Sequence, residues 1–276
     1  MKVRAFRVYP MSSVLFLFLG HLGIGIAVSL LLVSREAGVQ FFRFNSGLAA
    51  VLLLVALAFR PETGNGSLPE VFSIIALVTV AGALLLYWAT VGRVLSSWRP
   101  VWLWIAAVGG VAALAAQSLA WATVQMGPSA SLTALSFISS AALLGGSCTS
   151  MILGHWYLVL PSMNVSLLQR LVKFHIGSTI VRIVVVGLAI TVALSSWESP
   201  SGAGFDRYMY SIEGIFLWQR VLFGLLGPLV LSYLTWETAK IQSTQSATGI
   251  LYVDFFTVIV GEVLAKYLLV SQRVPL

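Results

Sequence analysis

Residues 14–33 read VLFLFLGHLGIGIAVSLLLV, an uninterrupted apolar stretch without a charged side chain. A helix needs about 20 such residues to cross the hydrocarbon core of a bilayer. The stretch follows a basic start with Lys2, Arg4 and Arg7, but it is longer than the apolar part of a secretory signal and has no small-residue cleavage pattern. It therefore predicts a first transmembrane helix rather than a signal peptide.

The rest of the chain has the same character. Of its 276 residues, 59% are hydrophobic and 9% are charged, and the mean hydropathy is +0.96, whereas a typical soluble domain has about 25% charged residues. So few charged side chains cannot cover a surface in water, so lipid must be the solvent for most of the exterior. The apolar runs are continuous rather than alternating, which excludes a β-barrel. The predicted fold class is an all-α, polytopic integral membrane helix bundle with about eight transmembrane helices.

Breaks in hydropathy divide the chain into eight predicted spans. They cover residues 12–33, 40–59, 70–92, 101–125, 129–158, 168–195, 213–236 and 248–270. The connecting segments, including the tight break at 126–128 and the longest at 196–210, have no room for a folded domain. We therefore expect a single transmembrane domain over residues 1–276. Both termini then lie on one side of the membrane, called face A; the opposite side is face B.

The formal net charge of the chain is +7. Basic loop residues that face anionic lipid headgroups explain such a surplus in a membrane protein, and no basic cluster is dense enough to predict nucleic-acid binding. Six basic residues fall on face A and seven on face B; those outside the N-terminal tail favour face B as the cytoplasmic side, whereas the tail favours face A. The predicted partners are the lipid bilayer and other subunits of a membrane complex, and no nucleic acid.

Five ionisable residues fall inside the predicted spans, where such a group costs several kcal/mol unless it is paired, hydrated or functional. They are Arg182, Arg220, Asp254, Glu262 and Lys266. The helix rise of about 1.5 Å per residue predicts that Arg182 can meet Asp254 and that Arg220 can meet Glu262. Lys266 lies one helical turn after Glu262. The pattern fits ion pairs that hold the last three spans together, or an arginine that binds an anionic ligand beside a carboxylate that carries protons.

The three histidines, His21, His155 and His175, all lie inside or at the edge of a span. His155 and His175 are predicted at similar depths near face B on successive helices, and imidazole is a common haem ligand. The pair therefore predicts axial ligation of a b-type haem iron, with Arg170 and Arg182 holding the propionates. His21 would serve a second cofactor or accept a proton. The alternative is that each histidine only forms hydrogen bonds between helices.

Small residues form a strip in the fifth predicted span, at 139–142 and 145–147. They would allow a flat macrocycle or another helix backbone to approach closely. Plain helix packing explains them as well.

The plan of eight short-looped spans with few intramembrane charges and no soluble domain resembles the membrane-anchor subunits of bacterial respiratory complexes, of the polysulfide and dimethyl-sulfoxide reductase type. The resemblance covers topology and length. It implies a multi-pass protein of the bacterial cytoplasmic (inner) membrane, with a quinone-facing partner subunit.

Three functions are compatible with these features. The first, our working hypothesis, is an electron-transfer subunit that binds b-type haem or exchanges electrons with quinone within a larger complex; it would be a non-autonomous part of an oxidoreductase, and we predict no catalytic residue. The second is a transporter of a small solute, an ion or protons, with a coupling site made of Asp254, Glu262 and Lys266. The third is a structural anchor subunit without a cofactor.

Overall fold

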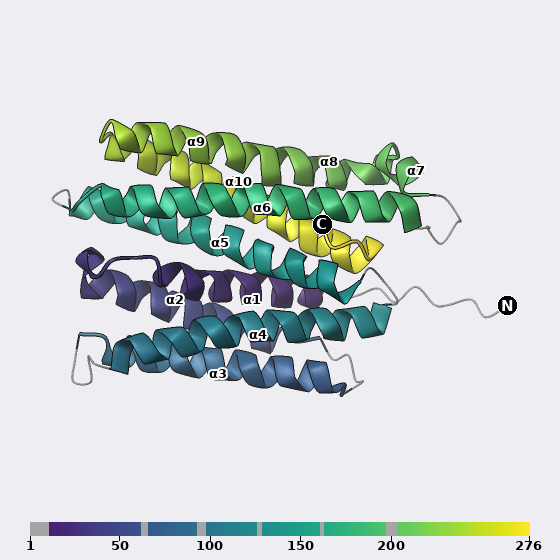
Figure 1. The fold of residues 1–276 in the computed structure, drawn as a ribbon, viewed down its shortest axis with the longest axis horizontal. Helices are drawn as coiled ribbons and strands as arrows, with labels where there is room; N and C mark the ends of the chain where they lie inside the picture. Colours follow the sequence, from purple (N-terminus) through teal and green to yellow (C-terminus); the bar gives the residue numbers. More distant parts are fainter. Residues whose placement is uncertain (1–10, 62–65, 93–97, 126–128, 161–162, 197–203) are drawn as a thin grey trace.

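The computed structural model is a bundle of helices, and it contains no strand among the residues it describes. The structure describes residues 11–61, 66–92, 98–125, 129–160, 163–196 and 204–276. The basic start and the expected break at 126–128 lie outside these ranges. The helices are α1 (Met11–Leu30), α2 (Gly38–Ala58), α3 (Leu68–Thr90), α4 (Arg99–Gln125), α5 (Ala130–Val159), α6 (Ser166–Ser196), α7 (Phe205–Met209), α8 (Ile215–Val221), α9 (Gly227–Lys240) and α10 (Thr244–Gln272), shown in Figure 1.

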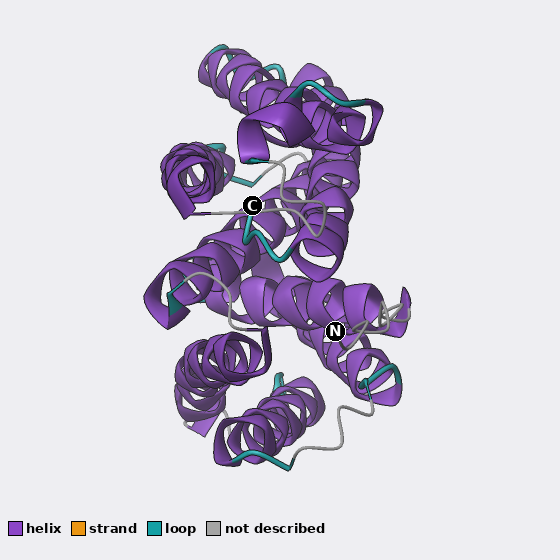
Figure 2. Ribbon diagram, turned by 90° about the vertical axis from the view of Figure 1, so that its right-hand side faces the viewer, coloured by secondary structure: helices purple, strands orange, loops and turns teal. Residues whose placement is uncertain are grey.

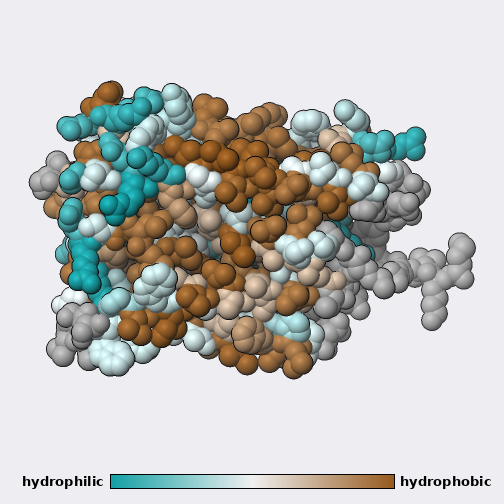
Figure 3. Space-filling view, in the orientation of Figure 1, coloured by the Kyte–Doolittle hydropathy of each residue, from teal (hydrophilic) through white to brown (hydrophobic). Residues whose placement is uncertain are grey.

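Seven helical segments of the described chain are long and apolar enough to cross a membrane. Six of them correspond to α1 to α6, and the seventh, Ile215–Lys240, runs from α8 through α9. The chain is therefore a multi-pass membrane protein with an all-α fold, as its sequence predicts. Apolar side chains cover the middle of the face seen in Figure 3, and polar ones gather toward its ends. The expected eighth span, α10, is not among the seven, and it carries Asp254, Glu262 and Lys266.

Successive long helices run in opposite directions, so that α1 begins and α10 ends at the same end of the bundle, face A (Figure 1). Viewed along the helices, the bundle has an elongated cross-section (Figure 2). The two most buried spans are α1 and α5, each with 83% of its apolar window inside the protein. They pack against each other, and α10 packs against α5, α9 and α1. The middle of α5 is therefore enclosed by other helices.

Two glycines mark the crossing of α1 and α5. A Cβ atom built on Gly25 would overlap the backbone of Ala141, and one built on Gly145 would overlap the backbone of Gly25. Glycine has no side chain, so it permits two membrane helices to approach this closely. The crossing places His21, one turn before Gly25, against Ser140 of α5.

The seventh span is not a continuous α-helix. Between α8 and α9, residues Leu222–Leu226 form a π-helical turn, and such turns occur frequently at functional sites. Gly224 in this turn packs against Gly261 of α10, and a side chain at either position would overlap the backbone of the other. The turn therefore lies directly beside the part of α10 that carries Glu262.

The α1–α5 crossing provides a first test. We expect Gly145→Ala to lower the free energy of unfolding by about 1–3 kcal/mol, because the added methyl group overlaps the backbone of Gly25. The measurement is the Tm of the protein in mild detergent. The control is Gly20→Ala on α1, because a Cβ at Gly20 meets no atom within 4 Å. Equal Tm values for the two variants would show that α1 and α5 do not cross at this glycine pair.

Candidate functional site

The carboxylate of Glu262 on α10 is the centre of a cluster of buried charged side chains. Its Oε1 accepts hydrogen bonds from Nη2 of Arg220 at 2.6 Å and from Nε of Arg182 at 3.0 Å. Its Oε2 accepts from Nη2 of Arg182 at 3.2 Å and from the hydroxyl of Ser140 at 2.5 Å. Nζ of Lys266 lies 3.6 Å from the same oxygen. Donors from α5, α6 and α8 therefore converge on one carboxylate of α10.

Arg182 extends from α6 and is fixed at each of its nitrogens. Its Nη1 donates to the hydroxyl of Ser136 at 2.9 Å, to the backbone oxygen of Ser136 at 3.0 Å and to the hydroxyl of Ser139 at 3.3 Å. Its Nη2 also donates to the backbone oxygen of Leu276 at 2.8 Å. These acceptors, together with Glu262, hold the planar guanidinium in one orientation.

Arg220 extends from α8, just before the π-helical turn. Its Nη1 donates to the backbone oxygen of Gly224 at 2.8 Å, and its Nη2 donates to Glu262. Its Nε has no hydrogen-bond partner among the described residues, although Arg220 is completely buried. The close approach of Gly224 to Gly261 is what brings this arginine within reach of Glu262.

Ser140 connects the cluster to α1. Its hydroxyl donates to Glu262, accepts from Nζ of Lys266 at 2.7 Å and lies 3.2 Å from Nδ1 of His21. Because the hydroxyl has one hydrogen, which Glu262 accepts, we assign the ring proton of His21 to Nδ1. Nε2 of a neutral His21 then carries no proton, and no hydrogen bond to it is found within the described part of the chain. His21 therefore has one free basic nitrogen in the interior of the bundle.

Cationic side chains outnumber anionic ones in this cluster. Arg182, Arg220 and Glu262 have no exposed surface, and Lys266 is 1% exposed. When Glu262 is ionised, three basic side chains surround one side-chain carboxylate, and Arg182 also donates to the main-chain oxygen of Leu276, the last residue of the sequence. An uncompensated charge away from water costs several kcal/mol. Binding of an anion, or loss of the lysine proton, would relieve this surplus.

A second polar cluster lies on α5, α6 and α10, nearer to face B. Nε2 of His175 is 2.8 Å from Oδ2 of Asp254, and the hydroxyl of Ser147 donates to the same oxygen at 2.7 Å. Nδ1 of His175 and Oδ1 of Asp254 have no hydrogen-bond partner among the described residues. All three residues are buried. His175 and Asp254 are therefore within ion-pair distance, and each has one further atom, Nδ1 and Oδ1, that can accept a proton.

The two clusters are successive levels of one interface between α5 and α10. Ser147 meets Asp254 at one level, and Ser140 meets Glu262 at the next. The eight residues from Asp254 to Glu262 correspond to about 12 Å along α10. A line of polar contacts, which we call the α5–α10 seam, therefore runs from the face B side to the middle of the bundle.

The structure confirms two of the pairings predicted from the sequence. Arg220 pairs with Glu262, and Lys266 lies beside Glu262 on the same helix. The predicted pairing of Arg182 with Asp254 is wrong, because Arg182 binds Glu262.

The error comes from the position at which the sixth span begins. The sequence estimate counted from Phe174, but α6 begins eight residues earlier. Arg182 is therefore 16 residues, or about 24 Å, along α6, and Glu262 is 18 residues, or about 27 Å, along α10, which runs in the same direction. His175 and Asp254, at about 13 and 15 Å, form the level nearer to face B.

The expected match in depth between His155 and His175 is also wrong. His155 is exposed near the end of α5, where its Nδ1 lies 2.9 Å from the hydroxyl of Tyr252. His175 is opposite Gly146, since a Cβ there would lie 3.5 Å from its Cα. Gly146 and His155 are nine residues, or about 13 Å, apart along α5. The two imidazoles are therefore not arranged around a common iron position.

Arg170 and Arg182 are also separated. Arg170 is exposed at the face B end of α6, and the twelve residues between it and Arg182 correspond to about 18 Å. In the described part of the chain, no group of three or more His, Cys, Asp and Glu side chains is arranged to hold a metal ion. Haem and quinone binding remain predictions from the sequence.

Ser140 and Ser147 belong to the strip of small residues in the fifth predicted span, but their hydrogen bonds to the two carboxylates, and the contact of Ser136 with Arg182, were not predicted. Ser136, Ser140 and Ser147 are spaced at four and seven residues, which places them on one face of α5; this spacing is the signal that would identify them. Gln117 of α4 was also missed. It is buried, and its side chain lies beside His21.

No protein-family model matches the chain, and no curated protein matches it significantly.

Removal of the central negative charge tests the electrostatic role of Glu262. We expect Glu262→Gln to lower the free energy of unfolding by about 3–5 kcal/mol, because three buried cations lose their counter-charge. Thermal unfolding in detergent measures the change. The matched control is Glu237→Gln, which removes a carboxylate whose pair with Lys240 is more than 40% exposed; it should change the free energy of unfolding by less than about 1 kcal/mol. A Tm for Glu262→Gln no lower than that of Glu237→Gln would contradict this account.

Proposed function

We propose that the protein is a transporter that moves a small anion together with a proton across the membrane. The observation that carries the proposal is the surplus of buried cationic side chains around Glu262. Arg182, Arg220 and Lys266 present donors to a single carboxylate, and Nε of Arg220 has no partner. Ionisable groups inside membrane spans mark substrate and ion pathways.

Glu262 would act as an internal substitute for the transported anion. Its carboxylate occupies the donors of Arg182 and Arg220 that an incoming anion would use. Protonation of Glu262 removes the negative charge but leaves the guanidinium donors in place. Anion binding and proton binding are then linked, because each makes the other more favourable.

The α5–α10 seam would supply the proton path on the face B side. Asp254 and His175 have unpartnered atoms that can accept a proton, and they lie about 12 Å from the level of Glu262. His21 has a free Nε2 on the other side of Ser140. Chains of carboxylate and histidine side chains are common proton relays in pumps and transporters.

Reconstitution into liposomes tests the proposed activity. Vesicles that contain a pH-sensitive dye are given inward gradients of chloride, phosphate, sulfate or succinate, with the membrane potential held at zero. We expect at least one anion to drive proton uptake with the wild-type protein, and Glu262→Gln to take up the same anion without the proton. Absence of anion-driven proton movement with all four anions would contradict the proposal.

Anion binding can also be tested through stability. The substrate anion should raise the Tm of Glu262→Gln more than that of the wild type, because it restores the missing charge; at 100 times its Kd the gain would be about 2.7 kcal/mol. The Glu237→Gln variant controls for the general effect of salt. An equal rise in all three proteins would show that no anion binds beside the arginines.

An electron-transfer subunit remains a second candidate, favoured by Nε2 of His21 and Nδ1 of His175, which are buried without a hydrogen-bond partner among the described residues. A neutral imidazole nitrogen is what haem iron binds. In this function the protein would work with other subunits in the bacterial cytoplasmic membrane and exchange electrons with quinone.

A reduced-minus-oxidised absorption spectrum separates the two candidates. An electron-transfer subunit would show a b-type α band that is lost in His175→Ala or His21→Ala. His155→Ala is the control, because His155 is exposed and bonded to Tyr252. A flat spectrum of the purified protein would remove the second candidate.

A further inference from the structure

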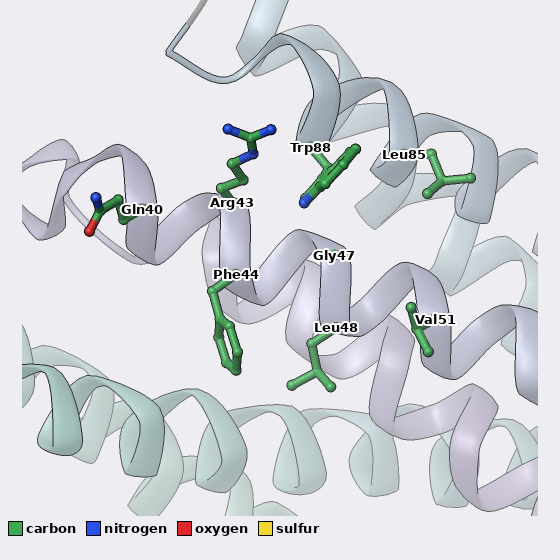
Figure 4. A pocket seen from close by; sticks show the side chains of 8 residues that line it. All are labelled: Gln40, Arg43, Phe44, Gly47, Leu48, Val51, Leu85 and Trp88. Atoms are coloured by element: carbon green, nitrogen blue, oxygen red, sulfur yellow. The ribbon is translucent and has the colours of Figure 1, made fainter.

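An open groove of about 670 Å³ lies between α2 and α3, on the outer surface of the bundle (Figure 4). It is remote from the Glu262 cluster, which is built on α5, α6, α8 and α10. Its lining residues are Gln40, Arg43, Phe44, Gly47, Leu48, Val51, Leu85 and Trp88. Most of these are apolar, and the polar ones are confined to one end.

The floor of the groove is Gly47. A Cβ built on Gly47 would lie 2.9 Å from Cδ1 of Trp88, so the indole ring lies directly on the backbone of α2. Any larger residue at this position would displace the ring and change the groove. The shape is therefore built by one small residue and one large aromatic residue from two helices.

The polar end of the groove lies at headgroup level. Arg43 is five residues after the start of α2, close to face B, and its guanidinium carbon is 4.9 Å from the centre of the Trp88 ring. In the described part of the chain no carboxylate pairs with Arg43. Trp and Arg side chains at such a position are typical of a membrane interface.

The apolar end extends toward the middle of the bilayer. Val51 and Leu85 line it, and Figure 4 shows them at the opposite end of the groove from Gln40. The eleven residues from Gln40 to Val51 correspond to about 16 Å along α2. This length is close to half the hydrocarbon thickness of about 30 Å, which is the depth of one leaflet.

The geometry points to a binding site for one anionic phospholipid in the face B leaflet. Arg43 and Gln40 receive the phosphate-containing headgroup, and one acyl chain lies in the groove beside Val51. The sequence favours face B as the cytoplasmic side, and anionic lipids are attracted to basic residues on that side. This site does not depend on the proposed transport function.

The charge of Arg43 makes the site selective for a lipid headgroup with a net negative charge. A zwitterionic lipid has a compensating positive charge close to its phosphate, so it gains less from an unpaired guanidinium than a lipid with a net negative charge does. Arg99 at the same end of the bundle is less available, because its Nε donates to the hydroxyl of Tyr87 at 2.9 Å and its guanidinium lies over Phe42. Arg43 is therefore the cation that selects the lipid.

Native mass spectrometry of the full chain tests the site, with phosphatidylglycerol and phosphatidylcholine as the two probes. We expect one phosphatidylglycerol per chain to be retained at detergent concentrations that remove phosphatidylcholine. Arg43→Gln should weaken phosphatidylglycerol binding about fivefold. Its control is Arg170→Gln, which removes an exposed arginine at the same face and should leave the tightly held lipid in place.

A second pair of variants tests the path of the acyl chain. Val51→Trp fills the groove and should abolish retention of the lipid, whereas Val78→Trp should not, because Val78 has the same 55% exposure but does not line the groove. Both positions are on the exterior, so neither variant disturbs the packed interior. Equal binding of the two lipids, or unchanged retention in Arg43→Gln and Val51→Trp, would overturn the proposal.

Discussion

A carboxylate in the interior of a membrane protein is stable only when groups that have also left water neutralise it. Glu262 meets this condition with donors from α5, α6 and α8, and these donors are completely buried. The same contacts fix the positions of four helices, counting α10 itself. Without Glu262, the guanidinium groups of Arg182 and Arg220 would repel each other in a medium of low dielectric constant. The π-helical turn between α8 and α9 serves the same purpose. It contains Gly224, which lets the backbones of this turn and of α10 approach closely and so brings Arg220 within reach of Glu262.

The balance of charge around Glu262 also links stability to the proposed function. A site with three cations and one carboxylate is sensitive to any event that adds a negative charge or a proton. Asp254 and His175, on the level nearer to face B, form a smaller pair with unsatisfied atoms. Such groups are costly in a helix bundle, and a role in moving protons is a physical reason for their presence.

On the outer surface of the protein, the positive charge of Arg43 is neutralised differently from the charges around Glu262. Arg43 lies near the end of its helix, where its charge is near the headgroups and its stem covers an apolar surface. It therefore needs no carboxylate from the protein, and a lipid phosphate is the natural counter-charge. The contrast with Arg182, whose partners all come from the chain, reflects depth: one arginine lies at the interface and the other in the middle of the bundle.

The amino-acid composition and the apolar runs were sufficient to predict an all-α membrane protein, because lipid leaves no alternative to apolar helices of about 20 residues. The sequence also predicted the contacts of Glu262 with Lys266 and Arg220, since the first depends on helical spacing and the second on two residues that lie at similar estimated depths from face A. The partner of Arg182 was decided only by the tertiary structure. A helix that begins eight residues early shifts every depth on it by about 12 Å, and hydropathy does not locate such ends. The sequence also did not predict how each helix is rotated about its own axis. This rotation is set by close helix crossings, such as that of Gly25 against Gly145, and such crossings depend on the three-dimensional fit of two helix surfaces, which a hydropathy pattern does not contain.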